Sequence, residues 1–318
     1  MMDLVFCGTP QFAVPTLERL LATGFRVKLV ATQPDRPSGR GLQLAESPVK
    51  RTALALGLPV VQPEKIKSND EFRAQLESIA PEAIIVVGYG RIIPQWMIDL
   101  PKLGNINLHA SLLPKYRGAA PIQWAIAAGE NVTGVTTMRI DAGLDTGDIL
   151  LQSEDRISPE DTALTLAPRL AQTGAELMFA TLTGLKNGTI TPHPQDNAKA
   201  TLAPILKRED GLIDFSRSAA DAWNRLRGFQ PWPGAFTSFR GKMLHVHSAI
   251  PVSTVDIAPA GHFAIDSGRL LMGFAQGTAL EVRELQVEGK KRMTAHDFIN
   301  GYRPRSDEVL GTALRFPQ

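Results

Sequence analysis

Asn107, His109 and Asp145 are the side chains whose types and spacing predict chemistry in this sequence. Asn107 and His109 are two residues apart at the end of an apolar segment, and Asp145 follows in the turn motif LDTGD. When an amine attacks an acyl donor, the tetrahedral centre carries a negatively charged oxygen and an extra proton on nitrogen. The Asn107 amide and a protonated His109 can donate hydrogen bonds to that oxygen. An Asp145 carboxylate can stabilise the imidazolium and help to pass the proton. The pattern favours transfer to an amine that attacks directly, which leaves Cys7 as a strand-end residue and not a nucleophile.

The same three residues also have a structural interpretation. An Asn-x-His pattern is common, and a lone histidine at a strand end is more often part of the packing than of a reaction. The residue types alone therefore leave both interpretations open.

The elements that position these residues follow from an alternation of apolar segments and helical patterns. Strands are predicted at 4–7, 27–31, 83–87 and 105–108, and a helix at 12–23 that Gly24 ends. Strands separated by helices predict an α/β fold, a Rossmann-like, mostly parallel sheet with flanking helices. Such a sheet binds ligands beyond the C-terminal ends of its strands. Asn107 and His109 lie at such an end, and alternation along the strand places both on one side.

A second domain is predicted after a segment rich in proline, glycine and polar residues, 183–204, which is typical of a linker. Five short apolar segments follow it and predict a small antiparallel barrel or sheet. They lie at 235–239, 243–246, 262–265, 270–274 and 280–287. We expect a catalytic domain at 1–188, a linker at 189–206 and an OB-fold-like domain at 207–318.

Composition narrows the class of protein. The chain has 318 residues, 43% of them hydrophobic, and a net charge of +2. Its single cysteine excludes an internal disulfide framework, and no segment reaches the roughly 20 apolar residues that a membrane-spanning helix needs. The net charge is too small to identify a partner. We expect a cytoplasmic protein and a monomer.

The segment 32–50 is long for a connection inside an α/β unit, and loops of this length are usually functional or disordered. It carries Arg36, Arg40 and Lys50, and glycines at 39 and 41. Because glycines and charges outnumber apolar anchors there, we expect it to be mobile.

Several motifs resemble a known family. NLHASLLPKYRGAAPIQWAI together with LDTGD is similar to the formyltransferases that use 10-formyltetrahydrofolate. The opening FCGTPQFAVPTLERL, the segment QPDRPSGRG and the later LKREDGLIDFSRSAADAWNRLRGFQPWPGAF resemble the branch of this family that acts on methionine attached to initiator tRNA. The resemblance extends over nearly the whole chain.

The resemblance implies residue roles. Asn107, His109 and Asp145 match the catalytic residues of the family, and no metal is implied. The folate is expected against an apolar cleft that offers backbone hydrogen bonds, made by Ser111, Leu112, Leu113, Pro114, Val87, Gly88 and Tyr89. Contacts with tRNA are expected from the insertion and from the C-terminal domain, at Arg36, Arg40, Lys207, Lys290, Lys291 and Arg292. The basic run at 290–292 equally fits a solvated turn.

The sequence departs from the family pattern at three places. Ala110 stands where glycine is common, and Ile205 follows Ala203-Pro204 where lysine is common. Leu42-Gln43-Leu44 replaces the expected lysines of the insertion, which predicts weaker salt dependence of tRNA binding.

Three other functions remain to be weighed. A formyltransferase for a small amine, such as glycinamide ribonucleotide or an amino sugar, would use the same three residues but needs neither the basic insertion nor the second domain. A nucleotide-dependent oxidoreductase lacks support because the G-x-G-x-x-G motif is missing. A non-catalytic RNA-binding protein would not need His109.

We expect His245 and His247 to face one way as surface or packing residues, and Trp232 to pack in a core or between domains.

Overall fold

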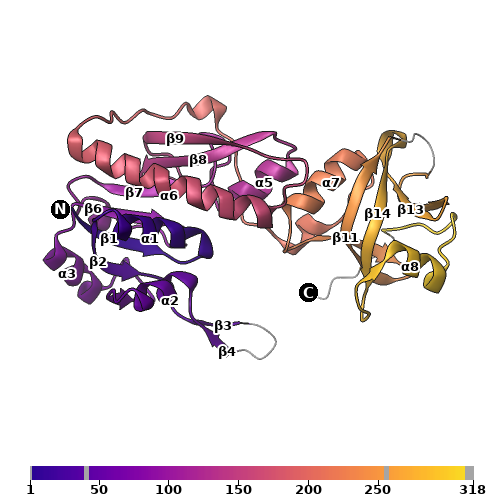
Figure 1. Cartoon of the computed structure of the whole chain (residues 1–318), viewed down its shortest axis with the longest axis horizontal. Coiled ribbons are helices and arrows are strands. Elements are labelled where there is room, and N and C mark those ends of the chain that lie inside the picture. The colour runs from indigo at the N-terminus through magenta and orange to yellow at the C-terminus, as the bar shows by residue number, and fades with distance from the viewer. Residues whose placement is uncertain (1, 39–42, 254–257, 312–318) are drawn as a thin grey trace. The chain divides into compact units, whose positions relative to one another are not determined.

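The computed structural model of the chain describes residues 2–38, 43–253 and 258–311 (Figure 1). It divides into two compact units. The first unit consists of Met1–Pro121, Val132–Arg156 and Leu166–Pro204, and the second of Ile122–Asn131, Ile157–Thr165 and Ile205–Gln318. The second unit thus includes two short segments that precede its main part in the sequence.

The first unit is built on a seven-stranded sheet. Its strands are, in spatial order, β5 (Val60–Val61), β2 (Arg26–Ala31), β1 (Asp3–Gly8), β6 (Ala83–Val87), β7 (Asn105–His109), β8 (Val132–Arg139) and β9 (Ile149–Arg156). The pairs from β5 to β7 are parallel, and β8 and β9 continue the sheet in antiparallel pairing. The predicted mostly parallel sheet is confirmed, and β8 and β9 are strands that we did not predict.

Helices cover both faces of this sheet. On one face, Val5 and Cys7 of β1 pack in a cluster with Phe72 and Leu76 of α3 (Asp70–Ile79). On the other face, α1 (Val14–Ala22) lies beside the long α6 (Ala163–Asn187). An ion pair joins these two helices, with Arg19 Nη2 2.8 Å from the Glu176 carboxylate. The remaining helices of this unit are η1 (Gln11–Ala13), α2 (Pro48–Ala55), α4 (Gln95–Ile98) and η2 (Asn197–Lys199). Burial on both faces explains why β6 is apolar throughout.

The first residues of the segment 183–204, which has the composition of a linker, are helical, while the expected linker boundaries, 189–206, stay a prediction. Residues 183–187 form the last turns of α6, because the apolar helical spacing continues through Met178 and Leu182, both fully buried. Gly188, with a φ of +69°, follows the end of the helix.

The segment 32–50 contains more structure than a single loop. β3 (Arg36–Ser38) and β4 (Gln43–Ala45) pair as an antiparallel ribbon. The segment also overlaps α2, whose N-cap Ser47 accepts the N–H of Lys50 at 3.0 Å. Arg40 lies outside the described residues, as do both glycines, so the expected mobility stays a prediction.

The second unit contains an antiparallel sheet that is consistent with a small barrel. Its order is β10 (Ala235–Phe239), β11 (Lys242–Val252), β14 (Ala279–Val287), β13 (Arg269–Gly273) and β12 (Phe263–Asp266), with β15 (Met293–Thr294) pairing with β14. These strands confirm the five predicted apolar segments. The helices are α5 (Pro121–Ala127), η3 (Arg208–Gly211), α7 (Ala219–Gly228), η4 (Ala275–Gly277) and α8 (Ala295–Tyr302). The core is mostly aliphatic and includes Phe239, Phe263 and Phe298 in mutual contact.

Within the described residues, no helix is both long and apolar enough to cross a membrane. The same residues contain no cluster of three or more His, Cys, Asp or Glu side chains that could hold a metal ion.

Candidate active site at the end of β7

His109 is the last residue of β7, and the sheet fixes the direction of its side chain. Leu108 packs against α6, where a methyl group on Gly174 would come within 2.6 Å of the Leu108 side chain. Alternation therefore places Asn107 and His109 on the opposite face, the face on which the Asn105 amide donates to the Met97 carbonyl at 2.7 Å. His109 is buried and Asn107 is half-buried.

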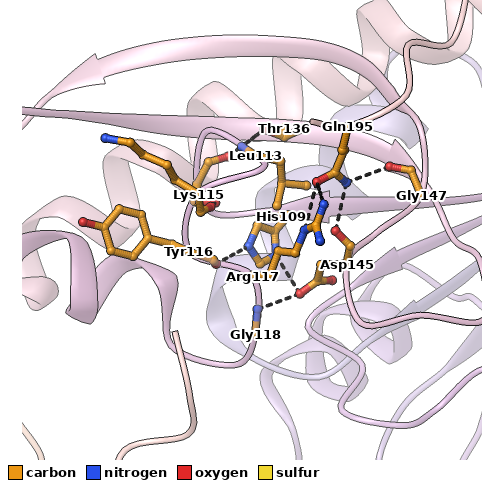
Figure 2. A network of polar contacts seen from close by, with 11 residues as sticks. His109, Leu113, Lys115, Tyr116, Arg117, Gly118, Thr136, Asp145, Gly147 and Gln195 are labelled. Carbon is orange, nitrogen blue, oxygen red and sulfur yellow. Dashed lines mark hydrogen bonds and ion pairs between the residues drawn. The ribbon is translucent and has the colours of Figure 1, made fainter. Parts of the chain in front are cut away.

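Both ring nitrogens of His109 face oxygen atoms (Figure 2). Nε2 lies 2.9 Å from the Tyr116 carbonyl oxygen, and Nδ1 lies 3.6 Å from Oδ2 of Asp145. The second distance is that of an ion pair and is too long for a good hydrogen bond. A carbonyl and a carboxylate only accept hydrogen bonds, so the ring meets an acceptor on each side. The predicted approach of Asp145 to the imidazole is what the structure shows.

Asp145 is held in an uncommon backbone conformation. Its φ is +52°, a left-handed value that costs a non-glycine residue on the order of 1 kcal/mol and persists only where the surroundings enforce it. Its Oδ2 accepts the N–H of Gly118 at 2.8 Å. The turn is closed by Asp141, whose carboxylate accepts the Thr146 hydroxyl at 2.8 Å.

The predicted linker supplies a residue that sequence reasoning missed. The side-chain amide of Gln195 donates to the carbonyl oxygens of Asp145 at 2.9 Å and Gly147 at 2.7 Å. Its oxygen accepts Nε and Nη2 of Arg117 at 3.0 and 2.7 Å. The buried guanidinium of Arg117 also donates to Asn197 at 2.8 Å. Figure 2 shows Gln195 and Arg117 beside the His109–Asp145 pair.

The predicted folate segment is tied to β8 and β9. Leu113 donates its N–H to the Thr136 hydroxyl at 3.2 Å, and its carbonyl accepts the Gln152 amide at 2.9 Å. The Ser111 hydroxyl donates to the Lys115 carbonyl at 2.6 Å, and the Ser111 carbonyl accepts the Thr136 hydroxyl at 2.6 Å. These polar groups are already hydrogen-bonded within the protein, whereas Leu112 and Pro114 are partly exposed.

The other predicted folate residues follow β6. Val87 ends β6 opposite Gly8 of β1, and Gly88 has a φ of +56°. The Tyr89 ring is buried, its carbonyl accepts the Gln33 amide at 3.0 Å, and burial raises the pKa of its phenol. Cys7 lies on the neighbouring strand, and burial raises the pKa of its thiol to about 12, which suits a packed residue and not a nucleophile.

The expected tRNA-contacting side chains lie on the surface of their units. Arg36 in β3 is exposed, as are Lys207, Lys290 and Lys291. Arg292 is exposed and pairs with Glu284 of β14.

The expectations for Trp232 and for the pair His245 and His247 have different outcomes. The packing predicted for Trp232 is wrong, because its side chain is 55% exposed while the adjacent Pro233 is buried instead. His245 and His247 are half-buried with their rings stacked at 6.2 Å, which confirms that they face one way. Burial, and then the neighbouring His247, lower the pKa of His245.

Comparisons with known proteins agree with this architecture. Residues 2–182 match the family model described as formyl transferase, and residues 205–303 match the model of the formyl transferase C-terminal domain. A methionyl-tRNA formyltransferase of Koribacter versatilis is 68% identical over 98% of this chain and 99% of its own length. One from Acidobacterium capsulatum is 66% identical over 98% of this chain and 100% of its own length.

A solved structure shares the fold at much lower identity. It is an N-formyltransferase from Helicobacter canadensis, in complex with folinic acid and dTDP-3-aminofucose. The TM-score is 0.66 at 21% identity, over 89% of this chain and 99% of that chain. The family models cover both halves of the sequence, and the two relatives align with nearly all of it. The chain therefore belongs to the formyl transferase family, within the branch of the methionyl-tRNA formyltransferases.

Proposed function

We propose that this protein transfers the formyl group of 10-formyltetrahydrofolate to the α-amino group of methionine on initiator tRNA, for translation initiation in the cytoplasm. The observation that carries the proposal is the His109–Asp145 pair at the end of β7, with Nδ1 and Oδ2 3.6 Å apart. The name shared by relatives up to 68% identical supports the choice of acceptor.

In this mechanism the amine attacks the formyl carbon directly and the charge collects on the formyl oxygen. His109, in its imidazolium form, and the Asn107 amide donate hydrogen bonds to that oxygen. Nε2 of His109 now faces the Tyr116 carbonyl at 2.9 Å, so the formyl oxygen replaces or shares that acceptor. Asp145 stabilises the imidazolium and takes part in passing a proton from the attacking amine to N10 of the folate. The tetrahedral centre then collapses, the bond between the formyl carbon and N10 breaks, and tetrahydrofolate leaves with that proton.

The proposed folate site lies along Ser111, Leu112, Leu113 and Pro114 and against Val87, Gly88 and Tyr89. Because Leu113 uses both of its backbone groups within the protein, this residue offers the folate apolar contact more than hydrogen bonds. A carbonyl oxygen has two lone pairs, so the Leu113 carbonyl can still accept one hydrogen bond from the folate.

The proposed tRNA contacts involve both halves of the chain. We assign residues 1–188 to the catalytic domain, 189–206 to the linker and 207–318 to an OB-fold-like domain that binds tRNA. We propose that the protein is a monomer. Phosphate contacts would come from the side chains predicted from the sequence, namely Arg36, Arg40, Lys207, Lys290, Lys291 and Arg292.

The test is a formylation assay with 10-formyltetrahydrofolate and methionyl-tRNA, with glycinamide ribonucleotide and an amino sugar nucleotide as competing acceptors. We expect formyl-methionyl-tRNA as the product and no effect of either competitor. Binding of the tRNA should weaken as salt is raised, because phosphate contacts release counterions. Formylation of a competitor in preference to the tRNA would overturn the proposed acceptor.

A further inference from the structure

Both ends of the segment 193–203, which follows α6, form backbone hydrogen bonds with the elements that carry the candidate active site. His193 exchanges two backbone hydrogen bonds with Ile149, at 2.8 and 2.9 Å, directly after the turn that carries Asp145. Further on, Arg117 donates its backbone N–H to Thr201 at 2.8 Å and accepts the N–H of Ala203 at 2.7 Å. This segment, 193–203, which we name the strap, is therefore hydrogen-bonded to the two segments that carry Asp145 and Tyr116.

Gln195 is the residue of the strap that contacts the turn of Asp145 through its side chain. Both amide hydrogens are used, one on the Asp145 carbonyl and one on the Gly147 carbonyl. The amide oxygen accepts two N–H groups of the Arg117 guanidinium. The hydrogen-bonding capacity of this amide is thus filled by two segments that lie far apart in the sequence.

Those two segments are the ones that surround His109. The segment containing Arg117 contributes the Tyr116 carbonyl at Nε2 and the Gly118 N–H that binds the Asp145 carboxylate. The turn contributes Asp145 itself, in its left-handed conformation. The side chain of Gln195 bridges the two segments by hydrogen bonds to both.

We propose that Gln195 is a positioning residue for formyl transfer, acting by holding Asp145 in place beside His109. The inference rests on the proposed function of the site and adds to it a residue of the strap that touches no reacting atom. Loss of its two donated hydrogen bonds releases the backbone of a strained turn, and small displacements of a reacting group slow a reaction steeply.

The variant that tests this is Gln195→Glu in the full-length protein. A glutamate has nearly the same shape and still accepts from Arg117, but as a carboxylate it cannot donate to the two carbonyl oxygens. Gln195→Met, which has a similar length and no hydrogen bonds, is the second variant should the carboxylate prevent folding. Gln172→Glu, on the exposed surface of α6, is the matched control for the added charge.

The readout is the single-turnover rate of formyl transfer at saturating substrates, with thermal unfolding measured for each variant. We expect Gln195→Glu and Gln195→Met to slow transfer by about tenfold or more, because displacement of a reacting group acts on the chemical step. The KM values for methionyl-tRNA and for the folate should change by less than about twofold, because no substrate contact is lost. Gln172→Glu should match the wild type.

A double-mutant cycle with Asp145→Asn separates positioning from general support. If Gln195 acts through Asp145, then Gln195→Glu has almost no further effect once Asp145 is Asn. Multiplicative rate losses, or a full rate in folded Gln195→Glu and Gln195→Met, would overturn the positioning role while leaving the formyltransferase assignment intact. If Asp145→Asn alone keeps the full rate, the role of Asp145 fails and the positioning role of Gln195 fails with it. If the wild type does not formylate methionyl-tRNA, the proposed function itself fails.

Discussion

The carboxylate of Asp145 lies 3.6 Å from Nδ1 of His109, and the same oxygen accepts the N–H of Gly118 at 2.8 Å. One oxygen atom thus meets the ring on one side and the backbone on the other. The direction of the carboxylate is fixed by a hydrogen bond that does not involve the imidazole. The carboxylate is therefore positioned to stabilise a positive charge on the imidazole ring in the proposed reaction.

Replacing Asp145 by asparagine should separate charge from shape. Asparagine tolerates the left-handed backbone, and its side-chain oxygen can still accept the Gly118 N–H, so the fold should be kept. Because the imidazolium loses its counter-charge and the amine loses its proton relay, we expect the single-turnover rate to fall by about 100-fold or more. Single-turnover kinetics on folded Asp145→Asn measure this, and a rate close to that of the wild type would refute a role for the charge.

Gly118→Ala should destabilise the site through a direct clash. Gly118 has a φ of +124°, and a Cβ there would lie 2.6 Å from the Ala203 carbonyl oxygen of the strap. Gly188→Ala is the control, because φ there is +69° and no atom lies within 4 Å of the added Cβ. We expect Gly118→Ala to lower the free energy of unfolding by about 2 kcal/mol more than the control, as overpacking does. Equal free energies of unfolding for the two variants would show that the added methyl group does not clash with the Ala203 carbonyl oxygen.

The Cys7 thiol should be unreactive in the folded protein. Burial raises its pKa to about 12, so at pH 8 the thiol stays protonated, and only the thiolate attacks reagents. A disulfide reagent should label no cysteine before denaturation and one per chain afterwards. Rapid labelling of the folded protein would mean that Cys7 is accessible and ionised.

His245 should make the stability of the second unit depend on pH. Its pKa in the folded state is lowered by burial and by His247, so on acidification the unfolded chain binds a proton first, near its usual pKa of about 6.5. Stability is therefore full above that pH and is lost as the pH falls through the folded-state pKa. Thermal unfolding at pH 7.5 and 5.5 should show a larger drop for the wild type than for His245→Gln, and equal drops would exclude His245 as the cause.

The sequence was sufficient for the parts of the fold that bury apolar side chains in regular patterns. β6 is apolar at every position because all of its residues are buried. β8 escaped prediction because threonines fill its buried positions. Thr136 and Thr137 are fully buried, and their hydroxyl groups are satisfied by Ser111 and Thr181, so the apolar pattern of a buried strand is missing.

The candidate site divides in a similar way. His109 was predictable because it ends an apolar strand, and Asp145 because its motif resembles that of a family. Gln195 gave no local signal, since its partners are 48, 50 and 78 residues away and its neighbours are typical of a linker. A polar side chain whose role depends on such distant contacts can be found only once the fold brings them together.

The most direct test of the account is His109→Ala, assayed for formyl transfer and for tRNA binding on the same preparation. The ring is proposed to donate to the developing oxyanion, so the single-turnover rate should fall by about 100- to 1,000-fold. Affinity for methionyl-tRNA should stay within about twofold, because phosphate contacts elsewhere dominate it. A folded His109→Ala protein that formylates methionyl-tRNA at nearly the wild-type rate would contradict the assignment of the site.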